Sequence, residues 1–472
     1  MADTKLKKFL ETKRADFIAM SDEIWGYAEL CFKEVRSCRL QKEYLIKEGF
    51  EVQEKAGGLD TAFVGSFSLG SGKPVIGILG EYDALEGLSQ KAGINYKEPL
   101  KEGEAGHGCG HQALGCGALE ACVAVKDYME ENHLEGTIRY YGCPAEEGGS
   151  GKAFLVKAGV FDDADICLTW HPGLNNSLFN QALANIQVDF QFHGVSAHAA
   201  GQPHIGRSAL DAVELMNVGA NYLREHMVSD AKVHYAITDS GGTAPNIIPA
   251  YASVRYGIRA LKMSTVKELY DRVVDIARGA ALMTQTSVEY QVGQVYQDFL
   301  PNETLDSLAV RHMRQVIPAR YTNEEMEEAK YYQQMIAPET VEGMKAKMLG
   351  AMTCEKPSQD LYTPVVNFVY EGEPPFGLAS TDAGNVSWVV PMTAVYTSCY
   401  VLGSFGHSWQ MVAQGKSKIL HKGMYLAAEI LASMAVNLME EPKLVEMAKE
   451  DFKKATEGKE GRYFCGDTPG ND

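Results

Sequence analysis

Alternating hydrophobic and polar segments in the first third of the chain predict a sheet covered by helices. Four short runs rich in apolar and β-branched residues predict strands: 61–67, 74–79, 137–143 and 165–169. Two longer runs have the spacing of helices: 112–133 and 149–158. Strands that alternate with helices in this way are typical of an α/β fold, with a mostly parallel sheet and helices on both faces.

The pattern changes near residue 186 and predicts a second, smaller fold. The order strand, helix, strand, strand, helix, strand is predicted by these segments: 186–192, 206–226, 232–238, 251–259, 264–283 and 286–292. That order within about 110 residues is typical of the α+β ferredoxin-like arrangement, whose sheet is antiparallel. Helical runs return after residue 300, before an apolar strand at 394–402 and a long helix at 416–438.

These segments predict two domains, one of them discontinuous. We expect residues 1–185 and 298–472 to form the larger domain, and residues 186–297 to form a domain inserted into it. The hydrophobic content of 45% and charged content of 22% are those of a folded globular protein. A formal net charge of −18 argues against nucleic acid or an anionic membrane as the main partner.

The chain carries no sequence feature of secretion or membrane insertion. Its N-terminus alternates charged with apolar residues and lacks the apolar core of a signal peptide. The longest apolar stretch, 424–438, is too short to span a bilayer. Ten cysteines are scattered without a compact framework, as expected for reduced thiols. We therefore expect a cytoplasmic protein.

Residues able to bind metals recur directly after predicted strands. The run GHGCGH at 106–111, which precedes a predicted helix, contains Cys109 and His111. The other candidates follow strand ends: Asp83, Glu146, Glu147, His171 and His407. In an open α/β sheet, sites form outside the carboxyl ends of the strands, so these segments are expected to converge. Thiolate, imidazole and carboxylate together indicate a transition-metal site.

Each of these residues also has an ordinary structural interpretation. Cys109 can be a buried thiol, His111 a partner of the helix N-terminus, and His171 a turn residue before a proline. The pair Glu146–Glu147 can be a solvated first turn, but it also suits hydrolysis, which needs one carboxylate to hold metal and another to take a proton from water. Because adjacent side chains are expected to point in different directions, one would ligate and the other would face the substrate.

Seven motifs, spread in order over almost the whole chain, carry a specific resemblance. They are EYDAL at 81–85, GHGCGH at 106–111, PAEEG at 144–148, WHP at 170–172, GVSAHAA at 194–200, STDAGNVSW at 380–388 and GHSWQ at 406–410. With them the chain resembles the aminoacylase and carboxypeptidase family of co-catalytic metallopeptidases. The resemblance implies a catalytic domain with two divalent metal ions, zinc or manganese.

The same resemblance implies roles for individual residues. It implies metal ligation by Cys109, His111, Glu147, His171 and His407, with Glu146 as general base. Asp83 and Gln112 are expected to hydrogen-bond around the ligands. Gln112 stands where the commoner family pattern has an acidic residue, and its amide can still donate or accept.

The inserted domain is implied to be a lid used for dimerisation. His198 is implied to stabilise the oxyanion, in many relatives from the partner subunit, and Asn246 and Arg259 to hold the substrate's carboxylate. The alternative for His198 is an ordinary surface histidine, and for Arg259 a solvated strand end. A homodimer through the lid is expected, and a heteromer is the alternative.

The implied activity is hydrolysis of the amide bond of an N-acyl amino acid, with p-aminobenzoyl-glutamate or a similar compound as substrate. Two alternatives stay open from the sequence. One is a dipeptidase or carboxypeptidase of broader specificity, because pocket shape decides between these substrates. The other is a subunit that is inactive until a partner chain joins it.

Overall fold

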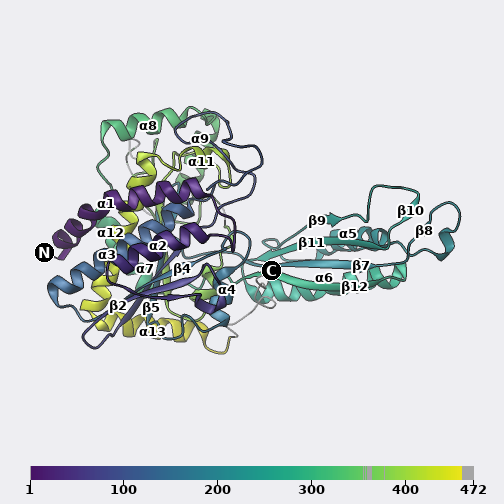
Figure 1. Ribbon diagram of the computed structural model, residues 1–472, viewed down its shortest axis with the longest axis horizontal. Helices are drawn as coiled ribbons and strands as arrows, with labels where there is room; N and C mark the ends of the chain where they lie inside the picture. Colours follow the sequence, from purple (N-terminus) through teal and green to yellow (C-terminus); the bar gives the residue numbers. More distant parts are fainter. Residues whose placement is uncertain (1, 354–355, 357, 359–363, 377, 460–472) are drawn as a thin grey trace. The chain divides into compact units, whose positions relative to one another are not determined.

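The computed structural model describes residues 2–353, 356, 358, 364–376 and 378–459 of the 472-residue chain. The chain divides into two compact units (Figure 1). The first unit contains Met1–Gln181, Leu300–Leu378 and Val386–Arg462. The second unit is built on Ala182–Phe299 and includes the segment Ala379–Asn385.

The first unit is built on an eight-stranded sheet. In spatial order its strands are β1 Glu51–Glu54, β2 Phe63–Leu69, β4 Gly136–Cys143, β3 Val75–Glu81, β5 Ile166–Gly173, β14 Met392–Ser398, β6 Asn176–Leu178 and β13 Val369–Tyr370. The central strands β4, β3, β5 and β14 are parallel, whereas β1 and β2 pair antiparallel at one edge. Strand β3 is buried along its whole length, as expected for a central parallel strand.

Three long helices pack together beside this sheet: α1 Ala2–Tyr27, α3 His111–Asn132 and α12 Lys418–Glu440 (Figure 1). Within the described residues, α12 alone is long and apolar enough to cross a membrane, and 89% of its apolar window is buried inside the protein. A helix that is apolar nearly all round belongs in a core. Ser417 caps α12, because its Oγ accepts from the Leu420 N–H at 3.1 Å.

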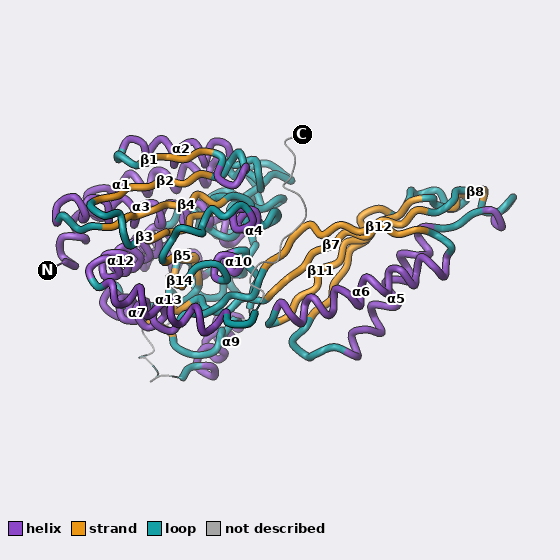
Figure 2. The backbone as a smooth tube through the Cα atoms, turned by 90° about the horizontal axis from the view of Figure 1, so that it is seen from below, coloured by secondary structure: helices purple, strands orange, loops and turns teal. Residues whose placement is uncertain are grey.

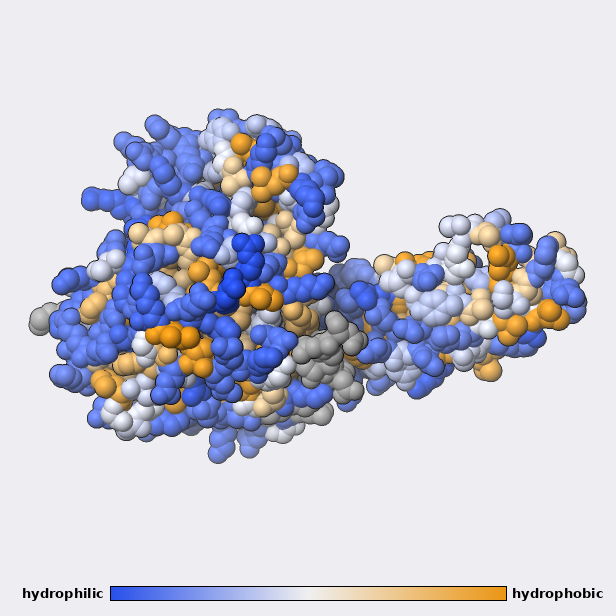
Figure 3. Space-filling view, in the orientation of Figure 1, coloured by the Kyte–Doolittle hydropathy of each residue, from blue (hydrophilic) through white to orange (hydrophobic). Residues whose placement is uncertain are grey.

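Further helices complete the first unit and its boundary. They are α2 Val35–Lys47, α4 Gly151–Lys157, α7 Glu303–Val316, α8 Asn323–Gln333, α9 Pro338–Ala351, α10 Ala383–Ser387, α11 Trp409–Ala413 and α13 Pro442–Thr456. On the face shown in Figure 3, hydrophilic residues predominate on each unit. Smaller groups of hydrophobic residues are scattered among the hydrophilic ones.

The second unit is a four-stranded antiparallel sheet with two helices on one face (Figure 2). Its strands in spatial order are β12 Ser287–Tyr296, β7 Ala184–His193, β11 Tyr251–Ala260 and β9 Lys232–Asp239. The helices are α5 Ala209–Leu223 and α6 Met263–Thr284. A short ladder of β8 Ala197–His198 with β10 Ile247–Ile248 is separate from this sheet.

The expected fold class is confirmed, and several details differ. Helices α1 and α2 were not predicted, although Leu6, Leu10, Phe17, Met20 and Ile24 recur at helical spacing and are all buried in α1. The predicted strand 394–402 ends at Ser398, and the residues after it form a loop. The short strands β6 and β13, of three and two residues, gave no periodic signal.

Candidate metal centre

The candidate ligands of the first unit come from the carboxyl ends of parallel strands. Glu81 ends β3, and Asp83 follows it by two residues. The loop after β4 carries Glu146 and Glu147, and His171 lies near the end of β5. Because the carboxyl ends of parallel strands meet at one edge of a sheet, these side chains converge there.

The GHGCGH loop places two candidate ligands at the start of α3. Leu85 and Gly106 form an antiparallel bridge. The Leu85 N–H donates to the Gly106 carbonyl at 3.1 Å, and the Gly106 N–H donates to the Leu85 carbonyl at 2.9 Å. Gly110 precedes α3 in the left-handed region at φ 87°, where a Cβ would lie 2.4 Å from the Tyr400 oxygen. Only glycine fits this position without displacement, so the turn delivers Cys109 and His111 to the site.

A second loop delivers the two glutamates. Ala145 adopts a left-handed conformation at φ 60°, which turns the chain sharply after β4. Its N–H donates to Glu34 Oε1 at 2.9 Å, while Thr61 Oγ donates to Glu34 Oε2 at 2.9 Å. Burial, with the charge of Asp83, raises the pKa of Glu34 to about 8. Glu34 is therefore the residue that holds this turn.

Five candidate ligands form two groups that share one sulfur. The groups are Cys109, His111 and His171, and Cys109, Glu147 and His407, and in each the donor atoms lie within 4.8 Å of one another. Cys109 Sγ lies 3.4 Å from His171 Nε2, and His407 Nε2 lies 3.4 Å from Glu147 Oε2. Donors on one zinc-like ion, with bonds of about 2.0–2.3 Å, are about 3–4 Å apart, so these separations suit shared metal ions.

Hydrogen bonds direct the imidazoles so that one nitrogen is left for metal. Asp83 Oδ1 is 2.8 Å from His111 Nδ1, and Asp83 Oδ2 accepts from the Glu147 N–H at 2.8 Å. His111 Nε2 and Glu147 Oε1 are buried and have no hydrogen-bond partner among the described residues. These two buried atoms lie 3.9 Å apart, and because neither has a hydrogen bond from the described part of the chain, a cation between them would satisfy both.

The electrostatics of the site couple metal binding to protons. Burial lowers the pKa of His111, but Cys109, Glu81 and Asp83 outweigh it and raise that pKa well above its ordinary value. Burial and the charge of Glu147 raise the pKa of the Cys109 thiol well above its ordinary value. A metal ion must displace both protons. Burial and then His111 lower the pKa of His171 to about 4, so this candidate ligand is neutral near pH 7.

The two adjacent glutamates converge more than the sequence suggested. Glu146 Oε2 and Glu147 Oε1 each lie 3.9 Å from His111 Nε2. The expectation that neighbouring side chains must diverge holds for extended strands, whereas this segment is a turn. Glu147 also reaches His407, and Glu146 does not belong to either group that contains Cys109.

Gln112 lies beside the site and contacts another segment. Its Nε2 donates to the Gly415 carbonyl at 3.2 Å, which ties the start of α3 to the chain after α11. His107, in the same GHGCGH run, is fully buried with Nε2 3.1 Å from the Ile24 carbonyl. Burial and the nearby His111 lower the pKa of His107 to about 3, so it is a neutral structural histidine.

The remaining candidates lie in the second unit, at two opposite ends of it. His198 pairs with Ile247 in the β8–β10 ladder, and the Asn246 carbonyl accepts from the Ala199 N–H at 3.0 Å. These two residues are therefore neighbours, close to the start of β11 at Tyr251. Arg259 lies near the other end of β11, eight residues on, which is about 27 Å at ~3.4 Å per residue.

Two charged residues of the first unit were not singled out from the sequence. Glu81 and Lys152 form a buried ion pair next to His111. Burial raises the pKa of Glu81, but Lys152, His111 and His171 outweigh this and lower it. The sequence offered one signal for a site role of Glu81, namely a charged residue at the end of the apolar run VIGILG. It offered no such signal for Lys152.

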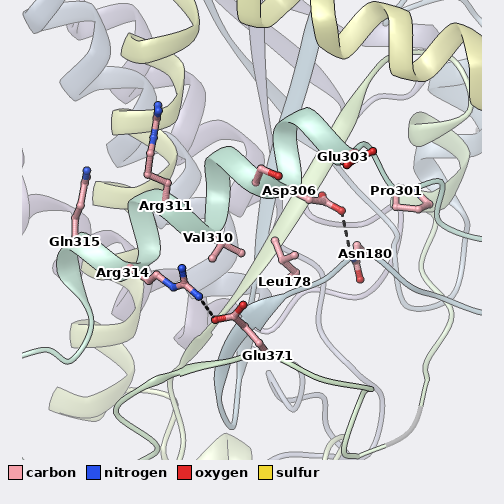
Figure 4. Close-up of a pocket in the computed structure, with 11 residues that line it drawn as sticks. Leu178, Asn180, Pro301, Glu303, Asp306, Val310, Arg311, Arg314, Gln315 and Glu371 are labelled. Carbon is pink, nitrogen blue, oxygen red and sulfur yellow. Dashed lines mark hydrogen bonds and ion pairs between the residues drawn. The ribbon is translucent and has the colours of Figure 1, made fainter. Parts of the chain in front are cut away.

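A separate hollow of about 850 Å³ lies along α7 in the same unit (Figure 4). Arg314 pairs with Glu371 at its rim, and Asn180 donates to Asp306 at 3.1 Å. None of the candidate ligands lines it. The hollow is therefore distinct from the metal centre.

Comparison with known proteins identifies the family. The chain is 42% identical over 467 residues to one of the subunits of p-aminobenzoyl-glutamate hydrolase of Escherichia coli K12, an alignment that covers 97% of this chain and 95% of the relative. Residues 180–283 match the M20 peptidase dimerisation domain. The chain belongs to the M20 peptidase family.

The chain is also similar to a second curated protein and, in fold, to a solved structure. Xaa-Arg dipeptidase of Mus musculus is 28% identical over 452 residues, covering 92% of this chain and 88% of the relative. A Bacillus subtilis structure described as a dinuclear metal binding M20 peptidase has a TM-score of 0.57 at 16% identity, covering 91% and 99% of the two chains. The expected family, fold class and enzyme class are thus confirmed: this M20 chain is a hydrolase of the metallopeptidase and amidohydrolase type.

Proposed function

We propose that this M20 chain hydrolyses the amide bond of an N-acyl amino acid, with p-aminobenzoyl-glutamate or a close analogue as substrate. The observation that carries the proposal is a pair of three-residue candidate ligand groups that share Cys109, with the carboxylate of Glu146 beside them. The 42% identity to a subunit of the E. coli p-aminobenzoyl-glutamate hydrolase supports the substrate class.

Two divalent ions, manganese or zinc, are proposed to be held by the five ligands. One would lie among Cys109, His111 and His171, and the other among Cys109, Glu147 and His407. When bound, the two ions supply positive charge that acidifies a water molecule and polarises the substrate carbonyl. Asp83 orients His111 and fixes the main chain of Glu147 through its two oxygens.

Glu146 is proposed as the general base. Its carboxylate takes the proton of the attacking water and then returns this proton to the amine nitrogen that leaves. The attack forms the bond from water oxygen to carbonyl carbon, and collapse breaks the bond from that carbon to nitrogen. Its position 3.9 Å from His111 Nε2, outside both Cys109 groups, supports a role in proton transfer.

The second unit is proposed to act as a lid that dimerises, with substrate contacts from both copies. His198 would stabilise the oxyanion, a contribution of about 3–4 kcal/mol for one such donor. Asn246 and Arg259 would hold the substrate carboxylate. His198 lies near the start of β11 at Tyr251, and Arg259 lies about 27 Å further along this strand, so one small substrate reaches both His198 and Arg259 only if they come from different copies.

The test is an assay of the purified chain, loaded with manganese or zinc in turn. Its substrates are p-aminobenzoyl-glutamate, a panel of N-acyl amino acids and a panel of dipeptides. We expect p-aminobenzoyl-glutamate or an acyl amino acid to be cleaved fastest. Fastest cleavage of dipeptides would favour the second candidate, which the likeness to Xaa-Arg dipeptidase supports.

The E. coli relative is named as one subunit of its hydrolase, so a second polypeptide is the other candidate partner. Absence of turnover by the metal-loaded chain alone, with turnover restored by a partner chain, would favour a heteromer. Glu146→Gln is expected to bind metal normally and to lose at least about a hundredfold in kcat, since general bases contribute about 10²–10⁴-fold. We propose the cytoplasm as the location of the enzyme.

A further inference from the structure

A lysine and a glutamate form a buried ion pair directly beside the proposed metal centre. Lys152 Nζ lies 2.5 Å from Glu81 Oε1, and the two side chains are 0% and 4% exposed. Burying two charges costs several kcal/mol per ion by desolvation, and their attraction repays this only with very good geometry. Such a pair is therefore weak evidence for a role in stability and calls for another explanation.

The second oxygen of Glu81 points at a proposed ligand. Glu81 Oε2 is buried and accepts no hydrogen bond from the residues that the structure describes. It lies 3.2 Å from His111 Nε2, which is likewise buried without a hydrogen bond from the described part of the chain. Asp83 occupies His111 Nδ1, so Nε2 is the nitrogen left for a metal ion.

The 3.2 Å separation is that of two donors on one ion. With bonds of about 2.1 Å, two neighbouring donors lie about 3.0 Å apart in octahedral geometry and about 3.4 Å apart in tetrahedral geometry. Glu81, His111 and Glu146 also offer donor atoms that all lie within 4.8 Å of one another. The Glu81 oxygen lies closer to His111 Nε2 than the Glu146 oxygen does, at 3.2 Å against 3.9 Å. The orientation of the Glu81 carboxylate is also fixed, because Lys152 binds its other oxygen.

We propose that Glu81 Oε2 is a fourth protein ligand of the ion held by Cys109, His111 and His171, and that Lys152 positions it through Oε1. The inference rests on the proposed two-metal function and deepens it. The two ions would then differ, since one has four protein donors and the other, with Cys109, Glu147 and His407, has three. Three protein ligands leave a position for substrate, whereas four are typical of a closed site.

Lys152 has a distinct part in this arrangement. It occupies Oε1, so Glu81 binds metal through one oxygen only. Its positive charge also offsets the added carboxylate in a site that already holds Cys109, Glu146 and Glu147. Lys152 is thus a positioning residue, and its removal should weaken the same ion that loss of Glu81 weakens.

The test titrates metal-free protein with Co²⁺ and separately with Mn²⁺, and follows both ions by metal analysis and by the visible Co²⁺ spectrum. Wild-type protein is expected to bind two ions. Glu81→Gln is expected to weaken one of them by at least about 10–100-fold, the loss typical of residues that support a metal site, and to change the Co²⁺ bands of that ion. Lys152→Met is expected to weaken the same ion by a smaller factor.

A matched control removes another buried carboxyl from the same unit. Glu120 lies in α3 nine residues after His111 and is 1% exposed. Glu120→Gln is expected to bind both ions with wild-type affinity and wild-type Co²⁺ bands. Circular dichroism of every variant checks that the fold is retained.

The outcomes separate this inference from the proposed function. Two ions bound by Glu81→Gln with unchanged affinity and spectrum would overturn the inference alone, whereas a wild-type chain that binds no ion would overturn the proposed function. If Glu81→Gln does not fold, a crystal structure of the Mn²⁺-loaded wild-type protein decides. Glu81 Oε2 within about 2.0–2.5 Å of an ion supports the inference, and a separation beyond about 3 Å overturns it.

Discussion

Asp83 shows how one side chain organises a site without being counted among the ligands. Its two oxygens have different partners. Oδ1 is hydrogen-bonded to His111 Nδ1, and Oδ2 accepts from the Glu147 main-chain N–H. The carboxylate therefore connects the two ligand groups. Residues in this position orient ligands and raise their basicity.

Replacing this carboxylate by an amide should weaken metal binding. Asp83→Asn keeps the size of the side chain but leaves one acceptor oxygen for two donors. We expect a loss of about 10–100-fold in metal affinity, measured by competition with a chelator. Asp60→Asn, at an exposed position paired with Lys55, is the control and should leave affinity unchanged. Wild-type affinity in Asp83→Asn would contradict the orienting role.

Glu120 gives a pH dependence of stability that can be isolated. Burial raises its pKa to about 8, and neither oxygen has a hydrogen-bond partner among the described residues. Between about pH 4.5 and 8 the folded chain holds a proton that the unfolded chain has lost. Stability from this group is therefore full at low pH and falls as pH rises, by about 1.4 kcal/mol per pH unit.

Glu120→Gln should remove this dependence. The variant keeps the volume of the side chain and cannot ionise, so its thermal midpoint should decline less than that of wild type between pH 5 and 8. Thermal melts across this range, on metal-free protein, measure the difference. Parallel curves for the two proteins would show that Glu120 does not titrate as described.

At the scale of elements, the turn after β4 depends on a residue far away in sequence. Glu34, just before α2, accepts the Ala145 N–H and so holds the left-handed turn that carries Glu146 and Glu147. The start of α4 comes close to this turn as well, because a Cβ on Gly151 would lie 1.9 Å from the Pro144 carbonyl oxygen. The backbone around Glu146 thus orients the proposed general base.

Loss of Glu34 should disturb catalysis more than metal binding. Glu34→Ala leaves the buried Ala145 N–H without its acceptor, at a cost of about 1–3 kcal/mol in stability. A displacement of Glu146 by about 1 Å is expected to lower kcat by up to about a hundredfold, with a smaller change in KM. Glu29→Ala is the matched control, because Glu29 accepts N–H groups at the start of α2 and not in the turn. Equal losses of kcat in both variants would contradict the specific role of Glu34.

The elements also show what a sequence can and cannot reveal. Strong periodicity located the central strands and the order of the second unit, because burial of one face imposes a repeat of two or 3.6 residues. The GHGCGH run before α3 pointed to Cys109 and His111, and an imidazole at a strand end pointed to His171. Glu34 and Lys152 escaped notice because their roles come from contacts across 111 and 71 residues of chain, which leave no local pattern.

At the scale of the whole molecule, the two ends of the second unit make assembly testable. His198 and Arg259 lie at opposite ends of the second unit, so the proposed site draws His198 from a second copy. Mixing Glu146→Gln with His198→Ala chains would then rebuild one intact site in each mixed dimer. Half of the dimers are mixed and one of two sites is intact, which gives about a quarter of wild-type activity.

Mixing experiments need their own controls. Each variant assayed alone should be nearly inactive, and the mixture should gain activity with the rate of subunit exchange. A mixture that stays as inactive as its components would place His198 and Glu146 in the same copy's site. A mixture of Glu146→Gln with Asp83→Asn should not recover, because both changes fall in the first unit.

The shared sulfur makes the fate of both ions depend on one atom. Cys109 is a free cysteine that belongs to both ligand groups. Oxidation of that sulfur to a sulfinic acid, which cells do not generally reverse, removes a donor from the two groups in a single event. Peroxide would then weaken both proposed metal sites in one step.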